Sequence, residues 1–137
     1  MQLMIKTSVD YTLFFRELSH IPEDITPLTK SFYNSDFKQD EMLMKSWSAW
    51  LEKWKLARTK LAQEMKQVNP KYTLREWFLV PAYKKAEQGD YTLLRELQEI
   101  MTNPYDEQSL KIEEKYYRKK PSQLFDIAGI SHVSCSS

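Results

Sequence analysis

Residues 36–68 read DFKQDEMLMKSWSAWLEKWKLARTKLAQEMKQV and carry the strongest periodic pattern in the chain. Apolar residues recur there at steps of three and four, at Leu43, Trp47, Trp50, Trp54, Ala57, Leu61, Met65 and Val68. Such steps place side chains on one face of an α-helix. Asp36 with Gln39 resembles a capping box at its start, and Asn69-Pro70 ends it, since the residue before proline avoids helical geometry. The pattern predicts one long amphipathic helix over about 36–68.

A helical hairpin is predicted next, over about residues 73–102. Thr73 with Glu76 resembles a capping box for its first helix, in which Pro81 predicts a kink or two short pieces. Gly89 suits a left-handed C-cap, and Asp90 can begin the returning helix at once. So short a connection predicts that the two helices run antiparallel.

The rest of the chain is also helical in pattern or irregular. A shorter helix is predicted over about 9–21, with Pro27 in the first turn of a second element. A charged helix is expected over 110–119 and irregular structure over 121–130. The fold class is therefore all-α, an irregular helical bundle with an irregular C-terminal tail. We expect one domain over 1–130 and a flexible, thiol-bearing tail over 131–137.

Composition excludes several function classes. The 137 residues carry 20 basic and 19 acidic side chains, a net charge of +1, so neither nucleic acid nor a membrane is expected as partner. Segment 1–9 lacks the apolar core of a secretory signal. One cysteine excludes an internal disulfide and a cysteine-based zinc site. A reducing compartment is the simplest reading.

No catalytic or metal site is predicted. Two glycines in the whole chain cannot form a phosphate-cradling loop. The stretch Asp126-Ile-Ala-Gly129 is similar to a kinase metal loop, but no catalytic-loop His-Arg-Asp precedes it, so chance explains it better. His132 and Cys135 are three residues apart and could bind one metal ion together. Two ligands are too few for a structural zinc ion.

Three clusters have a structural and a functional interpretation. The carboxylate pairs Asp106-Glu107 and Glu113-Glu114 are better explained as a solvated face than as acid–base groups. The basic cluster Lys115, Arg118, Lys119 and Lys120 suits a helix C-terminus more than a phosphate site. Trp47, Trp50 and Trp54 suit a core or an interdomain contact more than a base-stacking platform. If no larger domain covers that face, it would be an exposed apolar patch.

Cys135 is the one candidate for a chemically reactive side chain, because it carries a thiol. A thiol without a basic neighbour is mostly protonated near neutral pH, and only His132 lies close in sequence. We expect an exposed, moderately reactive thiol that can form a mixed disulfide with another chain.

Several stretches, in order, resemble the C-terminal third of the selenoprotein O (SelO) family. They are Val9-Asp-Tyr-Thr-Leu13 with Phe15-Arg16, Asn69-Pro-Lys-Tyr72 with Leu74-Arg75, Ala86-Glu87 with Gly89-Asp-Tyr91, Pro104-Tyr105, and the ending Ser134-Cys-Ser-Ser137. The resemblance implies a kinase-like fold (a pseudokinase) that transfers AMP from ATP to Ser, Thr or Tyr hydroxyls of proteins, with Mg or Mn. The ATP and metal residues of the family lie in a preceding region that has no counterpart here.

The resemblance therefore carries over no catalytic, cofactor-binding or metal residue. Cys135 matches the position of the selenocysteine in animal members, which implies a redox role, with a cysteine of the missing catalytic lobe as partner. We expect the chain alone to be inactive and to pack on, or regulate, the missing catalytic lobe. An upstream chain would supply that lobe, and protein substrates would bind to the lobe. Met1 as first residue leads us to expect a truncated or split reading frame.

Other readings stay open. A free-standing helical interaction module with a redox-active C-terminal thiol is the main alternative, and a fragment without function is another. The resemblance implies the cytoplasm if the chain is bacterial and mitochondria if it is eukaryotic.

Overall fold

The computed structural model describes residues 2–127 and confirms the all-α class. Seven α-helices and three 3-10 helices occupy this part of the chain, which has no strand beyond a single bridge between Val9 and Phe32. The chain divides into two compact units, residues 1–70 and 71–137, which we call unit 1 and unit 2. Within 2–127 no helix is long and apolar enough to cross a bilayer.

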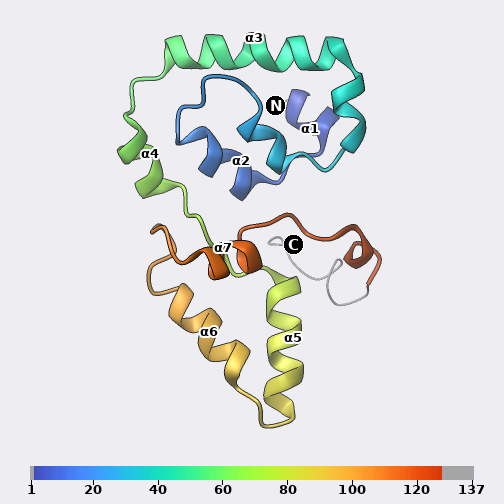
Figure 1. Cartoon of the computed structure of the whole chain (residues 1–137), viewed down its shortest axis with the longest axis vertical. Coiled ribbons are helices and arrows are strands. Elements are labelled where there is room, and N and C mark those ends of the chain that lie inside the picture. The colour runs from blue at the N-terminus through green and yellow to red at the C-terminus, as the bar shows by residue number, and fades with distance from the viewer. Residues whose placement is uncertain (1, 128–137) are drawn as a thin grey trace. The chain divides into compact units, whose positions relative to one another are not determined.

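Unit 1 contains four α-helices and two 3-10 helices. They are α1 (Gln2–Thr7), α2 (Tyr11–Leu18), η1 (Pro27–Ser31), η2 (Ser35–Gln39), α3 (Glu41–Ala57) and α4 (Ala62–Val68). Figure 1 shows α3 lying along one side of α1 and α2. The helix predicted over 9–21 is α2, and Pro27 begins η1 as predicted.

The start of α2 is fixed by Asp10. Its carboxylate accepts a hydrogen bond from the Leu13 N–H at 3.1 Å and one from the Tyr33 hydroxyl at 3.1 Å. Its own N–H donates to the carbonyl of Ser31 at 2.8 Å. An N-cap of this kind satisfies a backbone donor that has no partner inside the helix. Asp10 thereby fixes both the first turn of α2 and the chain that follows η1.

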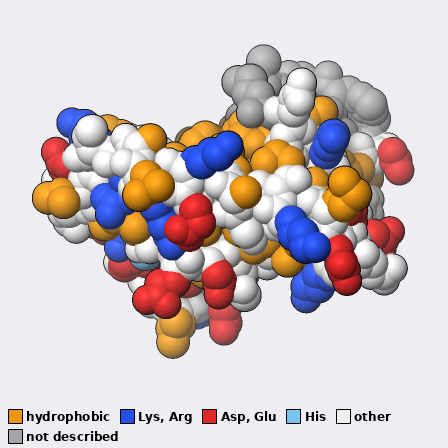
Figure 2. Space-filling model, turned by 90° about the horizontal axis from the view of Figure 1, so that it is seen from above, with side chains coloured by type: hydrophobic (Ala, Val, Ile, Leu, Met, Phe, Trp, Pro, Cys, Tyr) orange, Lys and Arg blue, Asp and Glu red, His pale blue; other side chains and the backbone are white. Residues whose placement is uncertain are grey.

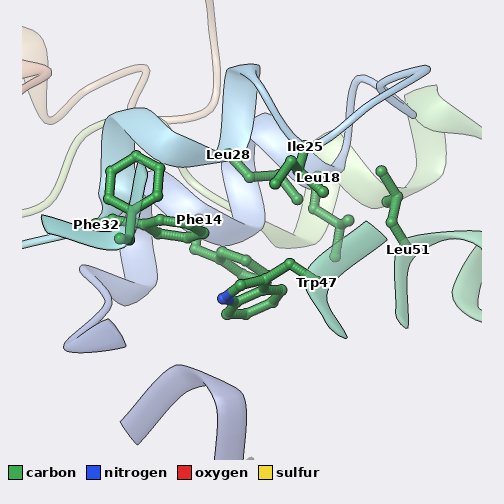
Figure 3. Packing of buried hydrophobic residues seen from close by; sticks show 8 residues of the cluster. Phe14, Leu18, Ile25, Leu28, Phe32, Trp47 and Leu51 are labelled. Atoms are coloured by element: carbon green, nitrogen blue, oxygen red, sulfur yellow. The ribbon is translucent and has the colours of Figure 1, made fainter. Parts of the chain in front are cut away.

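The core of unit 1 is aromatic. Its buried members are Phe14, Leu18, Ile25, Leu28, Phe32, Phe37, Trp47 and Leu51. The Trp47 ring lies 5.5 Å from that of Phe14 and 5.2 Å from that of Phe32, between centroids (Figure 3). Aromatic pairs at such separations add to the stabilisation from burial alone. The predicted face of residues 43–54 thus packs against unit 1 itself, with Trp47 buried and Trp50 and Trp54 partly buried.

The prediction of a single helix over 36–68 is wrong, because η2, α3 and α4 divide this range between them. Residues 35–39 form η2, α3 begins after Asp40, and the helix stops at Ala57 because Arg58 is extended, with φ −67° and ψ 139°. The next helix, α4, begins at Ala62, where the Glu64 carboxylate accepts from the Leu61 N–H at 2.8 Å. Neither glycine nor proline lies in residues 58–61, so neither of the usual helix breakers accounts for the break.

Unit 2, described as far as residue 127, contains the predicted hairpin. Its elements are α5 (Glu76–Glu87), α6 (Thr92–Ile100), α7 (Leu110–Tyr116) and η3 (Ser122–Leu124). Helix α5 starts three residues later than predicted, because the Thr73 hydroxyl accepts from the Arg75 side chain and caps nothing. Pro81 stays inside α5, which continues past it to Glu87 in one piece.

The turn between α5 and α6 matches the prediction at Gly89. Gly89 has φ +85°, and its N–H donates to the Ala86 carbonyl at 2.9 Å. The Asp90 N–H donates to the Lys85 carbonyl at 2.9 Å, which completes a Schellman-type cap. The Asp90 carboxylate then accepts from the Thr92 N–H at 3.0 Å and starts α6. The two helices run antiparallel, side by side (Figure 1).

Replacing Gly89 with alanine is expected to lower the free energy of unfolding by about 1 kcal/mol, the cost of a left-handed L-residue. No atom lies within 4 Å of the added Cβ, so backbone strain is the whole effect. Urea unfolding followed by far-UV circular dichroism measures it, with Glu87→Ala as the control at an exposed neighbour. An unchanged midpoint would contradict the left-handed turn.

Candidate functional site

The tryptophan face of unit 1 is built as packing. Trp47 is fully buried, and its Nε1–H donates to the Thr7 hydroxyl at 2.9 Å. Trp50 and Trp54 are partly buried against the same core. With Trp47 inside, the three rings do not form an open platform, so the structural interpretation holds for this face. Figure 2 shows charged and hydrophobic side chains interspersed over much of the surface seen from above.

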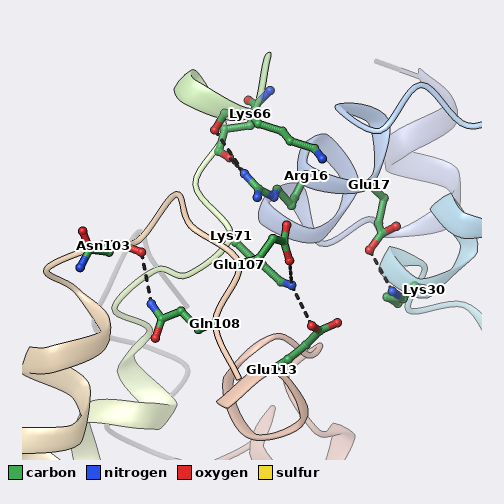
Figure 4. A network of polar contacts seen from close by, with 10 residues as sticks. Arg16, Glu17, Lys30, Lys66, Lys71, Asn103, Glu107, Gln108 and Glu113 are labelled. Carbon is green, nitrogen blue, oxygen red and sulfur yellow. Dashed lines mark hydrogen bonds and ion pairs between the residues drawn. The ribbon is translucent and has the colours of Figure 1, made fainter. Parts of the chain in front are cut away.

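Arg16 of α2 holds the C-terminal end of α4. It is buried, and its Nη1 donates to the carbonyls of Lys66 at 3.2 Å and Asn69 at 3.1 Å (Figure 4). The Asn69 amide donates to the Ser19 hydroxyl at 2.9 Å. The last carbonyls of a helix have no partner inside it, and a cation suits their partial negative charge. We call this set of contacts the Arg16 latch.

A second polar set, in unit 2, is centred on Lys71. Its ammonium group pairs with the carboxylates of Glu107 and of Glu113, the latter at 2.8 Å, although only 5% of the lysine side chain is exposed (Figure 4). It also lies 5.0 Å from the centroid of the Tyr117 ring. The backbone N–H groups of Lys71 and Tyr72 both donate to the Pro104 carbonyl, at 2.8 and 3.1 Å. This Lys71 cluster ties the start of unit 2 to the loop after α6 and to α7.

The carboxylates of this cluster correct an expectation from sequence. Glu107 and Glu113 are partners of a buried lysine, not simply members of a solvated face. Burial by itself lowers the pKa of Lys71, but the hydrogen bonds to Glu107 and Glu113 outweigh it, and the pKa is raised. Burial also raises the pKa of Tyr72. All these shifts keep the cluster in its ion-paired form, which is a structural role.

The basic cluster of residues 115–120 is divided among separate contacts. Lys115 pairs with the Glu96 carboxylate, which also accepts from the Tyr116 hydroxyl. The Arg118 guanidinium lies 4.7 Å from the Trp77 ring centroid, and buried Lys120 lies 5.3 Å from that of Phe125. These cations do not converge on one point, so the structural interpretation holds here too.

The pKa shifts around Glu96 have a common cause. Burial raises the pKa of Tyr116, and its hydrogen bond to the Glu96 carboxylate raises it further. Burial alone would raise the pKa of Glu96, but the hydrogen bonds from Lys115 and Tyr116 outweigh it and lower that pKa. The carboxylate is therefore held ionised, as the acceptor that fastens α7 to α6.

Glu96→Gln is expected to destabilise the protein by about 1 kcal/mol near neutral pH, because one charge-assisted acceptor is lost. A carboxyl group whose pKa is lowered on folding stabilises above its ordinary value of 4.5, and the effect disappears as the pH falls through the folded-state pKa. The difference from the wild type should therefore shrink below pH 4.5. Urea midpoints from pH 3 to pH 7 test this, with exposed Glu99→Gln as control; a constant difference would contradict it.

Two features of the described residues bear on ATP and metal binding. The polar pocket at the α5–α6 turn, about 560 Å³, is lined by Asp90, Glu96 and Glu99 against Arg95, a net negative charge that repels phosphate. Within 2–127 no three His, Cys, Asp or Glu side chains converge as metal ligands. Asp126 is exposed, beyond η3. His132 and Cys135, and the predicted tail over 131–137, lie outside the described residues.

Sequence reasoning missed Arg16 and Lys71 as organising residues. Both belong to stretches that carry the family resemblance: Arg16 contacts Asn69, and Lys71 follows Pro70 and contacts Pro104 through its backbone. For Lys71, the one local signal was its position directly after Asn69-Pro70. The resemblance therefore lies at the contacts that hold each unit together.

Comparison with known proteins identifies the family. The chain is 36% identical over 143 residues to the protein nucleotidyltransferase YdiU of Aromatoleum aromaticum and 37% identical over 143 residues to that of Tolumonas auensis, with 98% of this chain and 27% of each relative covered. The YdiU protein of Flavobacterium johnsoniae is 31% identical over 144 residues. No protein-family model matches the chain. The chain spans about a quarter of the length of these curated relatives, at their C-terminal part. By sequence, 98% of the chain is similar to the C-terminal part of YdiU protein nucleotidyltransferases, which form the SelO family.

Proposed function

We propose that this chain is the C-terminal helical part of a SelO-type protein nucleotidyltransferase and that it packs on the catalytic part. The observation that carries the proposal is the alignment: 98% of the chain matches only 27% of each relative. A segment that matches from end to end, inside a much larger protein, corresponds to one structural portion of it. The helical units, each with its own buried core or cluster, suit a packing role.

The activity proposed for the assembled protein is transfer of AMP from ATP to hydroxyl groups of Ser, Thr or Tyr in protein substrates. Mg or Mn and the nucleotide would bind to the catalytic part, and this chain would contribute stability and regulation. Cys135 would form a reversible disulfide with a cysteine of the catalytic part. The two thiols lose two protons and two electrons in that step, which a disulfide oxidant such as oxidised glutathione accepts.

A chimera tests the packing role. In it, this chain replaces the matching C-terminal segment of the Aromatoleum aromaticum relative. If the proposal holds, the chimera is a soluble monodisperse protein and labels substrate proteins from radiolabelled ATP, and the relative cut before that segment is less stable. A chimera that aggregates while the parent protein folds would contradict it.

A further inference from the structure

Helix α4 is the least covered element of unit 1. None of its seven residues is buried. Leu61, directly before it, is 66% exposed and Val68, at its end, is 71% exposed. Leu61, Met65 and Val68 follow a step of four and a step of three, so they share one face of the helix. We call this face the α4 stripe.

Polar contacts attach α4 at its C-terminal end. The Arg16 latch binds the carbonyls of Lys66 and Asn69, and the Asn69 side chain binds Ser19. These bonds use the backbone at the end of the helix and leave Leu61 and Val68 of the α4 stripe exposed, with Met65 partly buried. A seven-residue helix is only marginally stable alone, and most helical stability comes from packing of an apolar face. The latch thus places an unpacked apolar stripe at the surface of unit 1.

The charges around the α4 stripe are mostly positive. Residues 53–66 contain five basic side chains, Lys53, Lys55, Arg58, Lys60 and Lys66, against one acidic side chain, Glu64. Lys55 is already bonded to the Glu23 carbonyl and to Glu52, and Lys60 lies 3.8 Å from Glu64. Lys60 and Glu64 are both largely exposed, so the stretch keeps a net positive charge, with Lys60 and Lys66 at α4 itself. The complementary surface is therefore acidic around an apolar centre.

This charge pattern favours one occupant over two others. A symmetric dimer brings the same patch of two copies together, which would place like charges opposite one another. A membrane-surface helix has a broad apolar face with aromatic side chains, whereas this stripe has three aliphatic residues on two turns. The relatives, in contrast, carry this segment in one polypeptide with the remaining three quarters of their length. A covalently joined surface binds at high effective concentration, so a small stripe is sufficient.

We propose that the α4 stripe, with Lys60 and Lys66 beside it, docks on an acidic, apolar-centred surface of the catalytic part. The inference rests on the proposed function and adds the place of contact and the chemistry of the partner surface. Docking covers Leu61 and Val68, adds a second attachment of α4 besides its polar latch, and couples the break at residues 58–61 to the catalytic part.

Hydrogen exchange tests the contact in the chimera and in the isolated chain. The amides of residues 60–68 should exchange at least tenfold more slowly in the chimera, because docking suppresses opening of α4. Leu61→Asp with Val68→Asp should abolish this protection and lower the melting temperature of the chimera, yet leave that of the isolated chain within 2 °C. Lys60→Glu with Lys66→Glu should weaken the protection more at low salt than at high salt. Met42→Asp, at an 80% exposed site of unit 1, is the matched control.

The outcomes separate this contact from the proposed function. Protection elsewhere in the segment, without protection of residues 60–68, overturns the α4 contact and leaves the packing role standing. No added protection anywhere in the segment overturns both. Slower exchange of residues 60–68 in the isolated chain as its concentration rises, or on vesicles with anionic lipid, would assign the stripe to a second copy or to a membrane and overturn the proposal.

Discussion

Trp47→Ala is expected to destabilise unit 1 by about 3–5 kcal/mol, the usual range for removing a buried tryptophan. Trp47 is fully buried and contacts the rings of Phe14, Phe32 and Trp50 at centroid distances of 5.2–5.5 Å. The cavity left behind lies at the centre of the unit, where neighbouring rings cannot collapse into it. For a domain of ordinary stability this loss is a large fraction of the total.

Urea unfolding followed by circular dichroism measures the effect. Trp47→Phe should destabilise unit 1 less than Trp47→Ala, because it keeps an aromatic ring in the core. It still loses the hydrogen bond to Thr7, which contributes about 1 kcal/mol. Met42→Ala, at an exposed site of the same helix, should change stability by less than about 0.5 kcal/mol. A loss for Trp47→Ala no larger than that of the Met42 control would contradict the core described for unit 1.

Lys71→Met is expected to cost about 2–3 kcal/mol, somewhat less than the loss of one partner from a fully buried ion pair, because the two carboxylates are partly exposed. The change leaves the carboxylates of Glu107 and Glu113 near each other without the cation between them. It also removes the ammonium group beside the Tyr117 ring. Lys84→Met is the control, because the same chemical change occurs there on an exposed lysine of α5.

The pH dependence distinguishes the ion cluster from packing of the lysine stem. The pKa of Lys71 in the folded protein is raised above its ordinary value of 10.5 by its two carboxylate partners. A lysine with a raised pKa stabilises fully below its unfolded value, and the effect is lost as the pH rises through the folded-state pKa. The difference in unfolding free energy between wild type and Lys71→Met should therefore be constant from pH 7 to 9 and shrink above pH 10.5. A difference independent of pH up to 11.5 would contradict the ion cluster.

Local signals in the sequence predicted the elements that begin or end at a clear capping or turn residue. Gly89 and Asp90 identified the hairpin turn, because a left-handed residue and an Asx cap depend only on neighbours a few positions away. The buried face around Trp47 also followed from periodicity. By contrast, the break at residues 58–61 was missed because the apolar pattern continues through it, and the bonds that hold the end of α4 join Arg16 and Asn69 to partners fifty or more residues away in sequence.

The polar clusters could not be predicted for the same reason. Glu107 and Glu113 lie in a charged stretch that is typical of a solvated face, and their partner Lys71 is 36 and 42 residues away. Pairings at that separation depend on the fold of the hairpin. The resemblance to the family identified the stretches around these residues, and the structure assigns them contacts. The expectation for Cys135 stays a prediction.

Transfer of AMP from radiolabelled ATP by the purified chain, with Mg or Mn, tests the central claim most directly. The chain is incubated alone and with a generic protein substrate, beside a heat-treated control and beside the chimera with the catalytic part of the Aromatoleum aromaticum relative. We expect label from the chimera and none above the heat-treated control from the chain alone. Clear, metal-dependent labelling by the chain alone would contradict it, since a nucleotide site would then lie within these 137 residues.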